Sequence, residues 1–192
     1  MVVLTLMPAI ARAQGGPAPV AAPITSAQRV DWIVSGTIGP MSLGVGVFAG
    51  TFQTAINSPR EWGKTLTGFG KRYTEREADV AISNTLEAGL GAIWGEDPRY
   101  LASGRKRVWP RARWAIKTAF LAPRRNGGLA PAWGRYAGNV VNNVLENRWL
   151  PPSVTTWQQT AARSGEGLLG RIGGNLWDEF SPDVRRRLRR RP

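Results

Sequence analysis

The sequence predicts an all-α protein, a single irregular, glycine-rich helical bundle that follows an N-terminal signal segment. Apolar residues recur at steps of three and four through most of the chain, which is the spacing of one helix face. Prolines and capping residues interrupt this pattern at intervals that match the length of a typical helix. The length of 192 residues suits one domain with one helical core.

The N-terminal segment resembles a secretory signal. Residues 2–10 are apolar and are followed by Ala11-Arg12-Ala13, a small-x-small site that predicts cleavage between Ala13 and Gln14. We therefore expect a signal peptide over 1–13, a Gly/Pro/Ala linker over 14–24, a helical domain over 25–184 and an arginine-rich tail over 185–192. The alternative is an ordinary apolar N-terminal tail.

Residues 32–57 carry no ionisable side chain, although the rest of the protein is densely charged. A capping box at Thr25 predicts the start of a helix, and Pro40 restarts it. Gly46 and Gly50 have the spacing that lets another helix approach closely. The stretch is therefore either the buried centre of a bundle or a segment that meets lipid.

Two further helices are expected after this stretch. Ser58 and Pro59 have the pattern of a helix start. A stripe of large side chains is then expected to face the core, made of Trp62, Leu66, Phe69 and Tyr73. Another capping signal at Thr74 predicts a second start. Asp79 and Glu87 lie on the opposite face, where we expect solvent or arginine partners.

The C-terminal third contains the next expected helices. Pro131 begins one with an apolar stripe of Trp133, Ala137, Val140 and Val144, and Gly134 and Gly138 repeat the close-approach spacing. Its asparagines, Asn139, Asn142, Asn143 and Asn147, are expected to face water. Glycines over 165–174 predict a weak or broken helix with Trp157 inward. Ser181 and Pro182 predict one more start.

Basic residues dominate the charge, with 26 Lys and Arg against 13 Asp and Glu and a net charge of +13. Such a surface attracts anions. Eight cations and two tryptophans over 105–125 suit an amphipathic helix at an anionic interface, and the alternative is Trp packed inward with Arg in water. The expected contact residues are Arg105, Lys106, Arg107, Trp109, Arg111, Arg113, Trp114, Lys117, Arg124, Arg125, Arg185, Arg186, Arg187, Arg189, Arg190 and Arg191.

The chain contains no cysteine and no histidine. This composition excludes a thiolate nucleophile, a Ser-His-Asp arrangement and sulfur or imidazole metal ligands. Phosphate-binding and nucleophile-elbow motifs are also missing from the sequence. We therefore expect no enzyme, no cofactor and no metal site. The catalytic alternative is a carboxylate-based hydrolase of cell-wall sugar that uses two of Glu75, Glu77, Asp79, Glu87, Glu96 and Asp97.

Three short motifs occur in order along the chain. They are Gly-Lys-Arg-Tyr over 70–73, Asp-Pro-Arg-Tyr over 97–100 followed by Gly104, and Glu-Phe-x-Pro-Asp-Val over 179–184. Together they resemble an uncharacterised family of secreted, mainly helical bacterial envelope proteins. The resemblance implies an exported helical protein and carries over no catalytic residue.

The leading functional hypothesis is a non-enzymatic exported protein of the periplasm or envelope. It would bind anionic lipid or an envelope polymer peripherally through the Arg/Trp patches. The alternative is an integral membrane protein that spans the bilayer at about 33–56. A further alternative is nucleic-acid binding if the protein is not exported, whereas no specific nucleic acid is expected after export.

Overall fold

The computed structural model describes residues 22–189, so the expected cleavage site at Ala13 and Gln14, and also Arg190 and Arg191, lie outside the described residues. The helices are α1 (Ser26–Ile38), α2 (Pro40–Ile56), α3 (Leu66–Ile93), α4 (Val108–Phe120), α5 (Trp133–Glu146) and α6 (Trp157–Arg189). Short 3-10 turns, η1 (Arg60–Trp62) and η2 (Pro152–Val154), and two strands, β1 (Leu121–Pro123) and β2 (Leu129–Pro131), connect them. The predicted all-α class is confirmed.

Helix α3 is the centre of the molecule. It packs against α1 and α2, which follow one another in a kinked line, and against α5. The kink lies at Gly39, where Pro40 occupies the first position of α2. Residues 157–174 of α6 run beside α5. We call α1, α2, α3, α5 and residues 157–174 the body.

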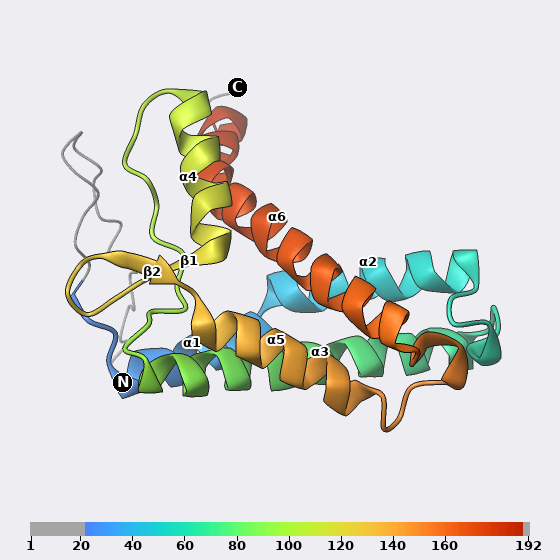
Figure 1. The fold of residues 1–192 in the computed structure, drawn as a ribbon. Coiled ribbons are helices and arrows are strands. Elements are labelled where there is room, and N and C mark those ends of the chain that lie inside the picture. Colours follow the sequence, from blue (N-terminus) through green and yellow to red (C-terminus); the bar gives the residue numbers. More distant parts are fainter. Residues whose placement is uncertain (1–21, 190–192) are drawn as a thin grey trace, which may run out of the picture.

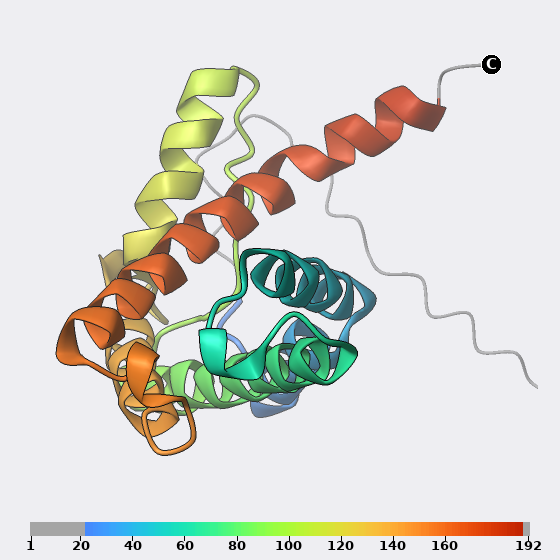
Figure 2. The same cartoon turned by 90° about the vertical axis from the view of Figure 1, so that its right-hand side faces the viewer.

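The other part of the molecule projects from the body. Helix α4 packs against the C-terminal part of α6, and Figures 1 and 2 show both elements extending away from α1, α3 and α5. The antiparallel β1–β2 hairpin, with its turn at residues 124–128, connects α4 to α5. We call residues 105–120, which contain α4, together with residues 175–189 of α6 the arm.

Four expectations about where helices begin or break are wrong. The start at Ser58 is the single turn η1, and α3 begins at Leu66, where the Thr65 hydroxyl accepts a hydrogen bond from the Gly68 N–H (3.0 Å). Thr74 lies inside α3, and α6 continues through 165–174 and through Pro182. Tertiary contacts override the weak local propensity of these positions.

The interior of the protein is polar. Among residues 22–189, the buried residues with an apolar side chain are three prolines and the alanines Ala88, Ala115, Ala119, Ala122 and Ala132, whereas the largest fully buried side chains are Arg72, Glu146 and Asn142. Soluble helical proteins normally bury their large apolar side chains and expose their charges. The distribution in the body is inverted.

This inversion corrects several expectations about side-chain direction. Asn142 and Asn143 are buried, while Trp133, Val140 and Val144 on the other face of α5 are exposed. Leu66 and Trp157 are exposed, the reverse of what the sequence predicted, whereas Glu87 is buried and has the arginine partners that were one of its two expected environments. The reason is that the polar groups of neighbouring helices hydrogen-bond to one another across the interior, which removes the cost of burying them.

Candidate membrane interface

Glycines allow the body helices to approach closely. A Cβ atom on Gly134 would lie 2.5 Å from the Gly91 backbone nitrogen, and one on Gly138 would lie 3.0 Å from the Glu87 nitrogen. On the other side of α3, Gly46 and Gly50 lie against Tyr73 and Phe69. All four glycines that the sequence suggested for helix packing are therefore at helix contacts. This spacing leaves little room for large apolar side chains between α3 and α5.

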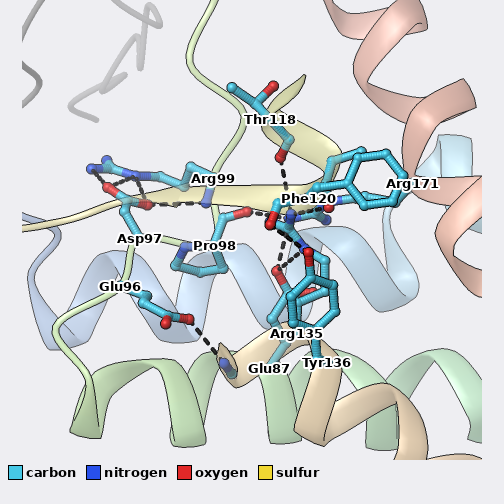
Figure 3. A network of polar contacts seen from close by, with 12 residues as sticks. Glu87, Glu96, Asp97, Pro98, Arg99, Thr118, Phe120, Arg135, Tyr136 and Arg171 are labelled. Carbon is cyan, nitrogen blue, oxygen red and sulfur yellow. Dashed lines mark hydrogen bonds and ion pairs between the residues drawn. The ribbon is translucent and has the colours of Figure 1, made fainter. Parts of the chain in front are cut away.

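The centre of the interior is an ion triad shown in Figure 3. Glu87 on α3 accepts hydrogen bonds from Arg135 Nε on α5 (3.0 Å) and from Arg171 Nη2 on α6 (2.8 Å). Arg135 also donates to the carbonyl oxygens of Thr118 (2.9 Å) and Ala119 (2.6 Å) at the end of α4. The triad therefore connects the body to the arm.

Two acidic residues, Glu96 and Asp97, lie in the segment that follows α3, and Figure 3 shows their polar contacts. Glu96 accepts hydrogen bonds from the Trp133 N–H (3.0 Å) and the Gly134 N–H (2.9 Å), so its carboxylate stabilises the N-terminus of α5. Asp97 pairs with Arg99 at 2.7 Å, so it is held within the segment that follows α3.

A second polar cluster lies nearer the other end of the body. Asn142 Nδ2 donates to Asp79 and to Glu146 (2.8 Å), and Arg163 Nε lies 3.4 Å from Glu146. Within residues 22–189, no group of three or more acidic side chains has an arrangement that could hold a metal ion. Asp79, Glu87, Glu96 and Asp97, which the catalytic alternative named, all make contacts inside the protein.

The arm is held by Glu179 on α6. Its carboxylate accepts hydrogen bonds from Tyr100 Oη (2.5 Å), from Ser103 N (3.0 Å) and Oγ (2.6 Å), and from Arg111 Nε (2.8 Å). Arg111 also pairs with Asp183 (2.5 Å). Burial acts to raise the pKa of Glu179, but the hydrogen bonds from Ser103 and Tyr100 hold it below its ordinary value. Two of the three short motifs thus meet in one structural contact.

The outward face of α1 and α2 is apolar. Its large side chains recur every three or four residues and point away from α3: Val30, Val34, Ile38, Met41, Val45, Phe48, Phe52 and Ile56 are all exposed, Phe48 to 73%. We call these eight residues the apolar stripe. Residues 26–56 are long and apolar enough to cross a membrane, and only 17% of their most apolar window is buried. The sequence left open whether this segment is buried or exposed, and in the structure it is exposed.

The rest of the body surface is also poor in charge. Among all the helical residues of the body, the exposed ionisable side chains are Asp31, Lys71 and Glu166, and the others are buried or half-buried. Helix α5 exposes an apolar face that includes Val140, Val141, Val144 and Leu145. Charge inside and apolar surface outside is the arrangement of a helical bundle in lipid.

Most of the expected cationic contact residues are on the arm surface. The exposed ones are Arg105, Lys106, Arg107, Trp109, Arg113, Lys117, Arg125, Arg185, Arg186, Arg187 and Arg189. Arg113 lies over the ring of Trp109 at 5.9 Å. Arg111 and Trp114 instead face inward, where Trp114 Nε1 donates to the Leu101 carbonyl (2.8 Å). Arg124 is half-buried beside Glu96.

Sequence reasoning missed the internal arginines. Arg72 is fully buried and donates to the carbonyl oxygens of Ser58 (2.7 Å), Pro59 (2.7 Å) and Gly63 (2.8 Å), which fixes the loop between α2 and α3. Arg135, Arg163 and Arg171 likewise point inward. A signal for them exists on α5, where Arg135, Asn139, Asn142 and Glu146 form a polar stripe at helical spacing.

The sequence and the structure were compared with known proteins. No protein-family model matches the sequence, and no curated protein and no solved structure matches it either.

Proposed function

We propose that this is a membrane protein of the bacterial envelope whose body is embedded in the bilayer and whose arm contacts an anionic surface. The inverted distribution of side chains carries the proposal. Exposing the apolar stripe and the apolar face of α5 to water would be unfavourable, whereas lipid accepts both. The buried charges meet the other requirement of a bilayer, because they are paired inside the bundle.

The dimensions of the body fit a bilayer. Measured along the helix axes, the 31 residues of α1 and α2 cover about 46 Å at 1.5 Å per residue, and the kink at Gly39 makes the direct span shorter; the hydrocarbon core is about 30 Å thick. Arg60 and Lys64 follow the C-terminal end of α2, and Arg29 and Asp31 lie in the first turns of α1. Charges therefore lie at both ends of the apolar stripe, at the depths of the two headgroup layers.

Embedding explains the surface better than peripheral attachment, which was the leading hypothesis from sequence. Helices α1 and α2, which carry the apolar stripe, lie on one side of α3 and α5 lies on another, as Figure 2 shows, and the apolar side chains of both sides are exposed. A protein that rests on a membrane surface brings only one of these sides to the lipid. Insertion of the body covers both.

The arm retains the role that the sequence suggested for it. Trp109 and Val108 are exposed on α4 beside Arg105, Lys106 and Arg107, so an apolar wedge lies next to a row of cations. Tryptophan and arginine together favour the headgroup region. Anionic lipid is the partner that we propose for this surface, and export to the envelope rests on the expected signal peptide.

Extraction of native membranes with alkaline carbonate tests the embedding. We expect the full-length protein to stay in the membrane pellet and to need detergent for release. Release by carbonate would refute the embedding, and salt-sensitive binding of the released protein to anionic vesicles would then place it on the membrane surface.

A second experiment tests the arm. We expect a variant with Arg105, Lys106 and Arg107 replaced by Gln to remain in the carbonate pellet. In nanodiscs, lipids brominated near the headgroup quench tryptophan fluorescence, and the part of the quenching that is lost on Trp109→Phe reports the contact of Trp109 apart from the other eight tryptophans. This part should be smaller in the triple variant than in the wild type with anionic lipid, and an equal part in both would contradict the role of these cations.

A further inference from the structure

The turn between α2 and α3 contains a groove that the embedding alone does not explain. Its volume is about 470 Å³, and it is lined by Thr51, Thr54, Ala55, Lys64, Thr65, Leu66 and Phe69. Figure 1 shows this turn at the end of the body that lies farthest from the β1–β2 hairpin. The groove is shallow and wide open, so it suits an elongated ligand that lies along the surface better than an enclosed small molecule.

Most of the groove wall is apolar. Phe69 lies against Gly50, where a Cβ atom would be 3.2 Å from the Phe69 ring. The hydroxyl groups of Thr51 and Thr54 donate to the carbonyl oxygens of Val47 (2.8 Å) and Gly50 (2.7 Å) within α2. Their donors are therefore satisfied by the helix backbone. An occupant of this part of the groove needs no polar groups.

One cation lies in the groove lining. Lys64 is exposed and makes no ion pair with any residue of the 22–189 range. Arg60 is a second exposed cation in the same loop, and the acidic Glu61 accepts a hydrogen bond from Ser153 Oγ (2.9 Å). The groove thus combines an apolar wall with positive charge at one end.

The groove is continuous with the lipid-facing surface. Ala55 in its lining lies three residues after Phe52 of the apolar stripe, so the two side chains are neighbours on the surface of α2, and Leu66 lines the groove while being 85% exposed. An acyl chain that left the groove would therefore meet the apolar stripe rather than water.

We propose that this groove binds one anionic phospholipid, with an acyl chain against Phe69, Leu66 and Ala55 and the phosphate at Lys64. The inference rests on the proposed function, because it places the groove at the headgroup depth of the bilayer. Charge complementarity selects the lipid class. A zwitterionic headgroup would bring a cation of its own beside Lys64, whereas an anionic headgroup brings none.

Native mass spectrometry of the full-length protein in mild detergent tests the proposal. The probes are phosphatidylglycerol and phosphatidylcholine, each added at increasing concentration. The wild type should retain one phosphatidylglycerol per chain in preference to phosphatidylcholine. Lys64→Gln should weaken this binding about fivefold, because one lysine near an anionic headgroup contributes roughly 1 kcal/mol. Ala55→Trp should abolish retention by filling the groove.

The matched control is Lys71→Gln, since Lys71 is the exposed lysine of α3 outside the groove. It should bind phosphatidylglycerol as the wild type does. Equal binding by wild type, Lys64→Gln and Ala55→Trp would overturn the proposal, as would equal retention of the two lipids by the wild type. Carbonate extraction tests the embedding separately. If only the groove proposal is wrong, the wild type and all variants stay in the membrane pellet. If the proposed function is wrong, the wild type is released from the pellet.

Discussion

Replacing Gly134 by alanine should separate α3 from α5, and the structure shows how strongly. The new Cβ atom would lie 2.5 Å from the Gly91 nitrogen, 2.6 Å from its Cα and 3.0 Å from the Glu87 carbonyl oxygen. All three are backbone atoms, so no side-chain rotation relieves the overlap. Overpacking of this kind costs about 1 to 3 kcal/mol, and here it also disturbs the Gly134 N–H bond to Glu96.

A second glycine provides a matched control. Gly170 lies inside α6, and a Cβ atom there would have no neighbour within 4 Å. Gly170→Ala should stabilise the protein by up to about 1 kcal/mol through helix propensity alone. The assay is the free energy of unfolding of detergent-solubilised protein, followed by far-UV circular dichroism. If Gly134→Ala were as stable as Gly170→Ala, the close contact of α3 and α5 would be refuted.

Three further predictions concern the charged groups and the arm. Glu87→Gln should lower the free energy of unfolding by about 3 to 5 kcal/mol, because it leaves Arg135 and Arg171 without their shared anion. The control Glu166→Gln, on the surface, should change the free energy of unfolding by less than about 0.5 kcal/mol. Similar values for both variants would contradict the triad. The pKa of Glu179 is lower in the folded protein than in the unfolded chain. Its contribution to the stability of the fold is therefore fully present above the unfolded pKa of about 4.3 and is lost as the pH falls through the folded pKa. The protection factor of the Trp114 indole N–H, which is its exchange rate relative to a free indole at the same pH, should therefore fall only under acidic conditions, and loss of protection at pH 6 would be inconsistent with the hydrogen bonds to Glu179. Trp109→Ala should weaken contact of the arm with anionic nanodiscs while leaving far-UV dichroism unchanged, and undiminished protection of α4 from hydrogen exchange by lipid would contradict the apolar wedge.

Helix periodicity predicted the elements but not their orientation. On α5 the sequence shows an apolar stripe through Val140 and Val144 and a polar stripe through Asn142 and Glu146, each with helical spacing. Periodicity distinguishes the two faces of the helix. The sequence prediction assumed that water surrounds the protein, and it therefore placed the polar face on the outside. The structure places it inside, because Asp79, Arg163 and Glu87 on neighbouring helices supply partners that are distant in the sequence.

Local signals were most informative where one residue has a specific backbone or packing role. The capping box at Thr25 and the restart at Pro40 both lie where the sequence placed them. Signals failed where tertiary contacts compensate for poor local propensity, as in α6, whose glycine-rich part is continuous because Arg163 and Arg171 anchor its inner side.

The most direct test of the embedding uses the absence of cysteine from the chain, which allows single cysteines to be labelled cleanly. Spin labels would be attached at Phe48→Cys on the apolar stripe, at Val144→Cys on α5 and at Lys106→Cys on the arm, in full-length protein reconstituted into vesicles. We expect the labels on the two apolar faces to collide with oxygen and to be shielded from a water-soluble nickel reagent, and the arm label to show the reverse. Ready access of the nickel reagent to Phe48→Cys or Val144→Cys would contradict a body surrounded by lipid on both sides.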